Sequence, residues 1–208
     1  MQRRAFLAGA PLALAACSAE PVWAPDAAVN NAVYRTEGPR SLTLYTMKNV
    51  GSENGAHTAL LVDASQRVLF DPAGSFHHPI IPERNDVLFG ITPQLEQYYV
   101  SYHARETFFV VGQKLIVSPQ VAEMALRLVM RHGAVAKANC TRATSSIVRQ
   151  LPGFENVGGT WFPNTLEGYF AEIPGVITRE YRETDADDKS VAASEQDAAI
   201  RAAVTAGR

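Results

Sequence analysis

SLTLYTM (residues 41–47), HTALLV (57–62) and RVLFD (67–71) are three short stretches rich in apolar residues, and polar segments separate them. The first alternates in the manner of a β-strand. The second and third flank Asp-Ala-Ser-Gln at 63–66, a turn signal, and so predict a β-hairpin. These three segments predict the beginning of an antiparallel sheet.

Helix signals follow the hairpin. Thr-Pro at 92–93 and Ser-Pro at 118–119 each combine an N-cap residue with a proline at the first helical position. Strands and helices do not alternate regularly, so the sequence favours an α+β fold, an antiparallel sheet packed against helices, over a doubly wound sheet. The expected later elements are a helix to about 104, a strand over 106–117, helices over 118–133 and 139–150, a short helix capped by Asn164, and a strand over 177–181.

The composition limits the class of protein. The chain has 208 residues, 47% of them hydrophobic and 19% charged, which suits one globular domain and excludes wholesale disorder. A net charge of −2 gives no basic surface, so we expect no nucleic-acid partner. Two cysteines exclude a disulfide-rich scaffold and a four-thiolate zinc site. Histidine and acidic residues show no metal-ligand spacing, so we expect no metal and no cofactor.

The N-terminus has the pattern of an export signal. Two arginines precede a short apolar run that is too short to span a bilayer, which predicts a signal peptide over residues 1–16. LAAC (14–17) resembles the bacterial lipobox, in which the cysteine, here Cys17, receives lipid, and RRAFL (3–7) resembles the twin-arginine signal. Ser18, by the same resemblance, favours the outer membrane. The alternative is a plain secretory signal with an accidental cysteine.

The remainder divides by composition. Residues 17–40 are rich in Ala, Pro, Asn and Gly without a period, which predicts a lipidated tether. Residues 41–182 form the predicted domain. Residues 183–208 are acidic and then alanine-rich, which predicts a tail that is a frayed helix or disordered. No later apolar run is long enough to span a membrane, so we expect a soluble body held by its lipid anchor.

Cys140 is the candidate nucleophile. It follows Asn139, a favoured N-cap residue, so it should lie in the first turn of a helix. A helix N-terminus lowers the pKa of a thiol, and its free N–H groups can hold an oxyanion. The alternative is an inert buried cysteine. Once Cys17 is acylated, Cys140 has no partner in an oxidising compartment, and its presence is easier to understand if it reacts.

A thiol nucleophile needs a base, and His57 is the candidate. It opens a strand after a polar loop, where it can meet a helix N-terminus packed on the sheet; the alternative is an exposed histidine at a strand end. We assign the other four to helix ends or to a loop (His103 and His132; His77 and His78). In the predicted hairpin His57 lies roughly across from Asp71 or Pro72, which makes Asp71 the first choice to orient the imidazole and His77 the second.

A histidine on a strand, a polar residue on the next strand, and Asn-Cys at a helix start resemble the circularly permuted branch of the NlpC superfamily. That branch includes bacterial envelope thiol hydrolases and relatives of lecithin retinol acyltransferase. The resemblance implies a permuted papain-like domain with Cys140 as nucleophile, His57 as base and Asp71 as orienter. Family members often carry His, Glu or Gln in the third position, so Asp71 departs from the pattern. Tyr45 could help to polarise the oxyanion.

The expected function is therefore that of an envelope-anchored thiol hydrolase or acyltransferase acting on amide or ester bonds, with peptidoglycan peptides as the first substrate to consider. The expected location is the periplasmic side of the outer membrane of a Gram-negative bacterium, with the membrane as partner through Cys17. A non-catalytic binding or assembly lipoprotein on the same fold is the second reading, and a structural lipoprotein with an unrelated α+β fold is the third. Four aromatic residues could line an apolar wall or pack in the core: Trp161, Phe162, Tyr169 and Phe170.

Overall fold

The computed structural model describes residue 19 and residues 21–206, leaving out some side chains of the last helix. The predicted signal peptide, Cys17 and Ser18 lie outside the described residues. Within the described part, no helix is both long and apolar enough to cross a membrane.

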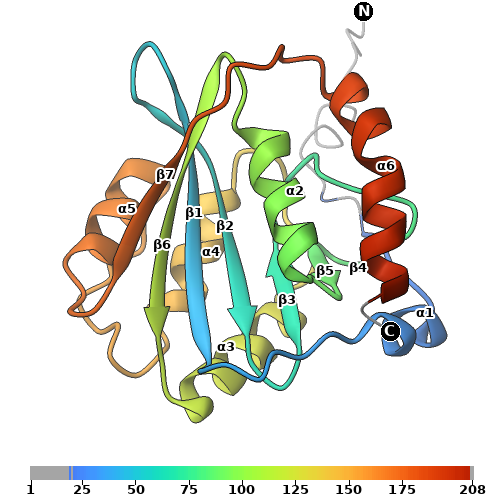
Figure 1. Cartoon of the computed structure of the whole chain (residues 1–208). Coiled ribbons are helices and arrows are strands. Elements are labelled where there is room, and N and C mark those ends of the chain that lie inside the picture. The colour runs from blue at the N-terminus through green and yellow to red at the C-terminus, as the bar shows by residue number, and fades with distance from the viewer. Residues whose placement is uncertain (1–18, 20, 207–208) are drawn as a thin grey trace, which may run out of the picture.

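The centre of the molecule is a seven-stranded antiparallel sheet in the order β4-β5-β3-β2-β1-β6-β7 (Figure 1). The predicted hairpin is confirmed, because β2 pairs with β3 from Leu60–Phe70 to Asp63–Arg67. The strands are β1 (Ser41–Asn49), β2 (Gly55–Asp63), β3 (Arg67–Phe70), β4 (Glu83–Arg84), β5 (Val87–Phe89), β6 (Phe108–Ile116) and β7 (Ile177–Tyr181).

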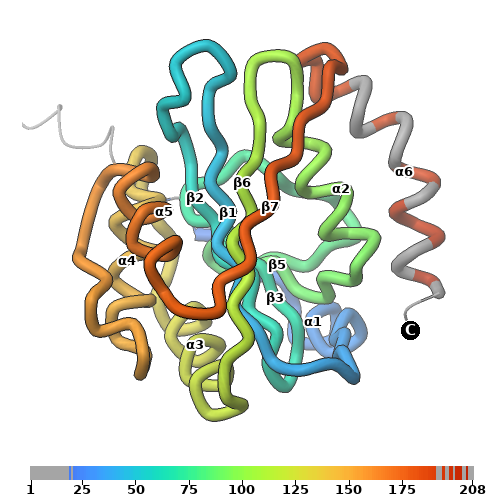
Figure 2. Tube along the Cα trace, turned by 60° about the vertical axis from the view of Figure 1, so that its left-hand side comes forward, coloured from blue at the N-terminus to red at the C-terminus, as the bar shows by residue number. Residues whose placement is uncertain are grey.

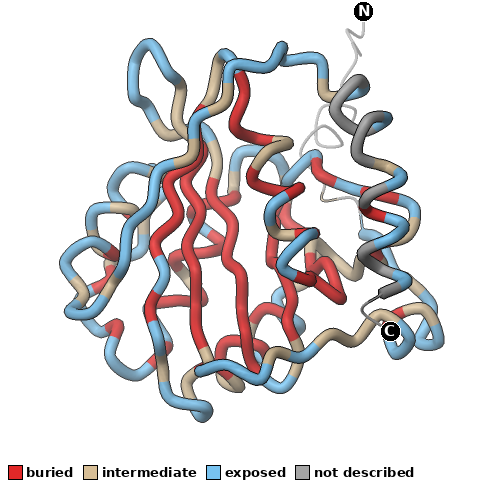
Figure 3. The backbone as a smooth tube through the Cα atoms, in the orientation of Figure 1, coloured by how far each residue is buried: buried red, intermediate tan, exposed pale blue. Residues whose placement is uncertain are grey.

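Both faces of the sheet are covered, so the central strands are buried (Figure 3). Leu44 and Leu60 face a core built with α3 (Pro119–His132), α4 (Cys140–Val148) and α5 (Pro163–Ala171). Tyr45 and Leu61 face a second core on the side of α2 (Pro93–His103) and α6 (Lys189–Ala206). The α+β class is thus confirmed, with helices on both sides of the sheet (Figure 2).

The two cap-and-proline signals mark helix starts as predicted. The Thr92 hydroxyl accepts a hydrogen bond from the Leu95 N–H at 3.2 Å, and the Ser118 hydroxyl accepts one from Val121 at 3.3 Å. The expectation for Asn164 is wrong. Helix α5 begins at Pro163, with Phe162 in the N-cap position, and the Asn164 side chain donates to the Glu53 carbonyl at 3.1 Å.

Residues 21–40 differ from the irregular tether that we expected, because much of this segment is built into the fold. It contains α1 (Asp26–Ala32), whose Val29 side chain is buried in the core. Farther along, the Tyr34 carbonyl accepts the Arg67 N–H at 2.9 Å. A seven-residue helix is too short to be stable alone. Tertiary contacts therefore form it, which is why the sequence shows no periodic signal.

The predicted tail forms a helix, α6, rather than a disordered segment. Ile200 is buried on the α2 side of the sheet, and Asp197 pairs with His78 at 3.0 Å. Figure 1 shows α6 beside α2. The C-terminal segment is thus part of the domain.

Candidate active site

His57 and Asp71 lie in direct contact. His57 Nε2 is 2.6 Å from Asp71 Oδ1, and the Asp71 side chain is only 3% exposed. The register of the hairpin explains the contact. Leu60 pairs with Phe70 at the end of β3, so Asp71 continues the strand by one residue and becomes the diagonal neighbour of His57 on the same face.

Tyr99 holds the Asp71 carboxylate and Gly74 leaves room for it, and the sequence did not single out either residue. The Tyr99 hydroxyl, on α2, donates to Asp71 Oδ1 at 2.8 Å. Gly74, whose N–H donates to the Asp71 carbonyl at 3.0 Å, leaves space for the other oxygen: a Cβ on Gly74 would lie 1.9 Å from Oδ2. Oδ2 is buried and has no hydrogen-bond partner among the described residues. The carboxylate is therefore held through Oδ1, by His57 and Tyr99.

Cys140 is the first residue of α4, as the sequence predicts. A tight turn precedes it, in which the Asn139 N–H donates to the Ala136 carbonyl at 3.2 Å and Ala138 has a φ of +64°. A positive φ strains a residue that carries a Cβ. Strained backbone of this kind is concentrated at functional sites.

Asn139 occupies the N-cap position of α4, but its side chain makes no capping hydrogen bond. Its φ of −108° and ψ of 9° differ from the extended conformation that lets a side chain reach back to the first turn. The side chain donates instead to the Lys137 carbonyl at 3.0 Å. The amides of the first turn are thus left without a side-chain cap from Asn139.

The thiol of Cys140 lies against the free edge of β2. β1 pairs with β2 at Thr58, but β3 pairs with β2 only from Leu60 onward, so the other edge of β2 is free there. The Thr58 backbone on that strand contributes to lowering the pKa of the thiol. Thr141 fastens the helix there: its hydroxyl is 3.7 Å from the Cys140 sulfur and 3.3 Å from the Thr58 hydroxyl. His57 lies close enough to Cys140 for its hydrogen bonding and charge to lower the pKa of the thiol. Since Nε2 of His57 faces Asp71, Nδ1 is the nitrogen left for the thiol.

The electrostatics favour a thiolate–imidazolium pair. Burial lowers the pKa of His57, but the charge and hydrogen bond of Asp71, together with Cys140, outweigh it and raise that pKa to about 10. Burial raises the pKa of Cys140, but the hydrogen bond and charge of His57, with Thr58 and Thr141, lower it to about 7. About half of the thiol is then ionised at neutral pH.

Asp71 supplies the negative charge that maintains this pair. Burial raises the pKa of its carboxyl group, but the His57 charge and hydrogen bond, with smaller contributions from His103 and Tyr99, lower it below its ordinary value. Asp71 is thus an anion across the physiological range, in contact with a cation.

His103 stands behind His57, although the sequence suggested only a helix-end role for it. The two imidazole rings are stacked with centroids 6.3 Å apart. His103 Nδ1 is 2.8 Å from the Tyr99 carbonyl, and burial lowers the pKa of His103 to about 4. His103 is therefore a neutral ring that donates to Tyr99. The i, i+4 spacing of Tyr99 and His103 on one helix face was the available signal.

Two other sequence predictions lie elsewhere. His77, the second choice as orienter, is exposed, with Nδ1 3.1 Å from the Ser75 carbonyl. Tyr45, proposed to polarise an oxyanion, instead donates its hydroxyl hydrogen to Glu96. Tyr45 lies on β1, whose odd-numbered positions face α2, and Glu96 on that helix accepts the hydrogen bond from its hydroxyl. The hydrogen bonds of these two side chains thus go to Ser75 and Glu96 rather than to His57 or Cys140.

The four aromatic residues divide between core and surface. Phe170 is fully buried and Tyr169 packs partly against the same core. Trp161 and Phe162 are exposed, and the Arg142 guanidinium lies 5.0 Å from the Trp161 ring. Arg142 is two residues after Cys140, so Trp161 lies beside the exposed side of the first turn of α4.

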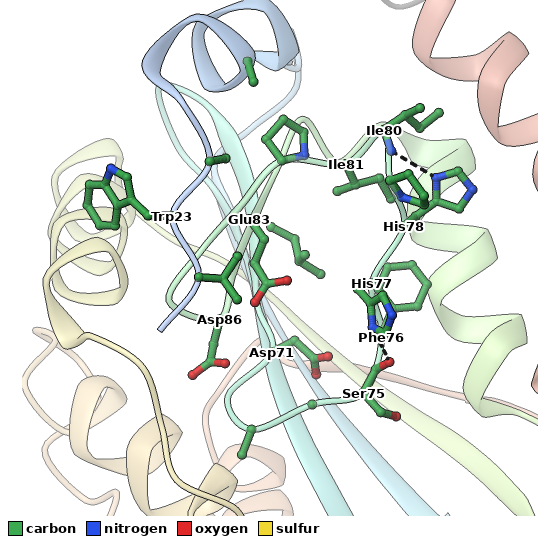
Figure 4. A pocket seen from close by; sticks show the side chains of 18 of the residues that line it. Trp23, Asp71, Ser75, Phe76, His77, His78, Ile80, Ile81, Glu83 and Asp86 are labelled. Atoms are coloured by element: carbon green, nitrogen blue, oxygen red, sulfur yellow. Dashed lines mark hydrogen bonds between the residues drawn. The ribbon is translucent and has the colours of Figure 1, made fainter. Parts of the chain in front are cut away.

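A cavity of about 960 Å³ borders Asp71, between the segment 22–31 and the loop 73–83 (Figure 4). Glu83 and Asp86 also line it, and burial raises the pKa of both carboxyl groups. Neither Cys140 nor His57 is among the described residues that line this cavity. It therefore approaches the site from the Asp71 side rather than from the thiol.

No group of three or more His, Cys, Asp or Glu side chains within the described part of the chain is arranged to hold a metal ion. The chemistry available from the residues themselves is thiolate attack with proton transfer through an imidazole.

Comparisons of the chain with protein-family models, with curated proteins and with solved structures found no match.

Proposed function

We propose that the chain is an envelope-anchored thiol hydrolase or acyltransferase that acts on amide or ester bonds, on a permuted papain-like fold. One observation carries the proposal: Cys140 at a helix start lies close enough to His57 for the imidazole to lower the pKa of the thiol, and His57 contacts the buried Asp71 at 2.6 Å. This is the nucleophile–base–orienter arrangement required for acyl transfer. The order of histidine before cysteine on an α+β fold agrees with the permuted branch.

The proposed reaction proceeds in two steps. The Cys140 thiolate attacks the carbonyl carbon and forms a C–S bond, while N–H groups at the start of α4 receive the oxyanion. His57 gives its proton to the leaving nitrogen or oxygen as that bond breaks, which leaves a thioester. Water, or another acceptor, then gives a proton to His57 and attacks the thioester, so that the acid or transferred acyl product leaves and the thiolate returns.

Peptidoglycan stem peptides are the first substrate to test, because the signal in residues 1–17 directs the chain to the periplasm, with Cys17 as the proposed anchor in the outer membrane. Purified peptidoglycan incubated with the protein should release peptides whose masses identify the cleaved bond. The Cys140→Ser protein should release none. Equal release by both proteins would contradict the assignment of Cys140.

A second candidate is a binding or assembly lipoprotein that uses the same fold without turnover. It is favoured by the limited access to the thiol: Cys140 is only 9% exposed, and the cavity beside Asp71 does not include it. The two candidates differ in the reactivity of the folded thiol.

Iodoacetamide labelling of the full acylated chain separates them, since acylation of Cys17 leaves Cys140 as the reactive thiol. We expect rapid labelling at pH 7 and a reduction of about tenfold or more in His57→Ala, because the pKa of the thiol then returns toward its ordinary value. His77→Ala, which changes an exposed histidine outside the triad, is the matched control and should label at the wild-type rate. Labelling only after denaturation would favour the non-catalytic candidate.

A further inference from the structure

The folded body begins close to the proposed anchor at Cys17. The chain is hydrogen-bonded to the sheet from Val22 onward, because the Asn85 N–H donates to the Val22 carbonyl at 3.0 Å and the Ala24 N–H donates to the Glu83 carbonyl at 2.9 Å. These bonds attach the segment beside β4, at one edge of the sheet.

Side chains hold the same segment. Arg84 Nε donates to the Ala24 carbonyl at 2.8 Å, and the Arg84 guanidinium pairs with Asp26 at 2.5 Å. Helix α1 follows directly, with Val29 in the core. The segment from Val22 to Asp26 is thus part of the folded body.

This attachment leaves a short link. Trp23 is six residues after Cys17, and an extended chain covers at most about 3.5 Å per residue, so the link reaches about 20 Å. A 24-residue tether over 17–40 would reach about four times as far. The body must therefore stay next to the membrane surface if Cys17 carries lipid.

The surface at the end of this link is apolar. Val22 is 44% exposed and Trp23 is 66% exposed, and the Arg84 guanidinium lies 4.5 Å from the Trp23 ring. We call these two adjacent side chains the Val22–Trp23 patch. Tryptophan favours the boundary between lipid and water, because its ring is apolar while its N–H can hydrogen-bond.

We propose that the Val22–Trp23 patch docks onto the lipid bilayer and fixes the orientation of the domain on the membrane. The inference rests on the proposed anchor at Cys17, but not on the proposed thiol chemistry. The short link points to the bilayer as the binding partner, because it keeps the patch within about 20 Å of the membrane in which Cys17 is anchored.

Docking also orients the cavity. Val22, Trp23, Pro25 and Asp71 all line the cavity, and Figure 4 shows Trp23 and Asp71 on different segments around it. A docked patch holds this cavity at the membrane interface.

The two tryptophans of the chain provide the test. Trp161→Phe leaves Trp23 as the fluorescent residue, and Trp23→Phe leaves Trp161, which is also exposed and also stacks on an arginine. Each full-length acylated variant is reconstituted into vesicles of phosphatidylethanolamine and phosphatidylglycerol, with or without bromine on the acyl chains. We expect brominated lipid to quench Trp23 at least about twofold more strongly than Trp161, with a blue-shifted Trp23 emission. Iodide in the aqueous phase should give the reverse order.

Equal quenching of the two tryptophans, or stronger quenching of Trp161, would overturn the docking inference. Shielding of Trp23 from iodide without quenching by brominated lipid would overturn it as well, since it indicates a protein contact. Fractionation of Cys17→Ala cells tests the anchor separately. If Cys17→Ala is released from the membrane but brominated lipid does not quench Trp23 in the Trp161→Phe protein, the anchor stands and only the docking is excluded.

Discussion

Single atoms around Asp71 decide whether the imidazole of His57 carries a charge. The Oδ1 atom of Asp71 contacts His57 and accepts a hydrogen bond from Tyr99, while Oδ2 occupies the space next to Gly74. Without the Asp71 charge, burial would leave His57 neutral, and Cys140 would lose the cation that lowers its pKa. The thiolate therefore depends on a residue that does not touch it.

Gly74→Ala should disable the site while leaving the fold intact. The new methyl group would overlap Oδ2 of Asp71 and push the carboxylate away from His57. We expect alkylation of Cys140 at pH 7 to slow by about tenfold or more, with unchanged far-ultraviolet circular dichroism. Gly168→Ala, at a helical glycine with open space, is the matched control and should keep the wild-type rate. Wild-type reactivity in Gly74→Ala would show that Asp71 does not set the thiol pKa.

At the scale of elements, the short β3 strand matters most. It stops at Phe70, so the edge of β2 at Thr58 is free to receive the start of α4. The strained turn at Ala138 then directs the helix so that Cys140 meets that edge. A longer β3 would occupy the position of the thiol.

The strain at Ala138 predicts a stabilising substitution. Ala138→Gly should raise the free energy of unfolding by up to about 1 kcal/mol, because glycine adopts a positive φ without the Cβ clash. Ala136→Gly, in the same turn but without a positive φ, should lower it by about 0.5 kcal/mol. Urea unfolding followed by circular dichroism measures both. A loss of stability in both variants would mean that the turn is not strained.

The C-terminal helix is a second element whose role can be tested. If α6 is part of the domain, Ile200→Ala should lower the free energy of unfolding by about 2 kcal/mol, since it removes a buried side chain from the α2-side core. Arg201→Ala, which removes only an exposed ion pair with Asp197, should leave it within error of the wild-type value. If neither Ile200→Ala nor Arg201→Ala changes the free energy of unfolding measured in urea, α6 is not packed stably on the domain.

At the scale of the whole molecule, a neutral histidine makes the fold sensitive to acid. The pKa of His103 is about 4 in the folded protein and about 6.5 when the chain is unfolded. A depressed pKa contributes stability that is present above pH 6.5 and is lost as pH falls toward 4. For this buried ring the loss amounts to about 3 kcal/mol.

His103→Gln should therefore flatten the fall in stability between pH 6.5 and pH 4.5, as measured by urea unfolding at each pH. Asp71 does not contribute in this range, because its pKa is lowered from 3.8. Parallel curves for wild type and His103→Gln would exclude His103 as the source.

The sequence by itself determined the features that depend on neighbours along the chain. Periodicity and turn residues located the hairpin and the central strands, and cap-and-proline pairs located two helices, because these signals are local. The same local information placed Cys140 at a helix start and brought His57 near Asp71, since a hairpin sets its own register.

Only the tertiary structure decided the rest. Tyr99 reaches Asp71 from α2, and His103 stacks on His57 from the same helix, so the contacts of this helix with the hairpin depend on how the chain folds. Helix α1 and the buried face of α6 form because the body supplies contacts that these segments lack alone. The charge state of the thiol belongs to this second group, because burial and the positions of distant charges set a pKa, and only folding establishes both.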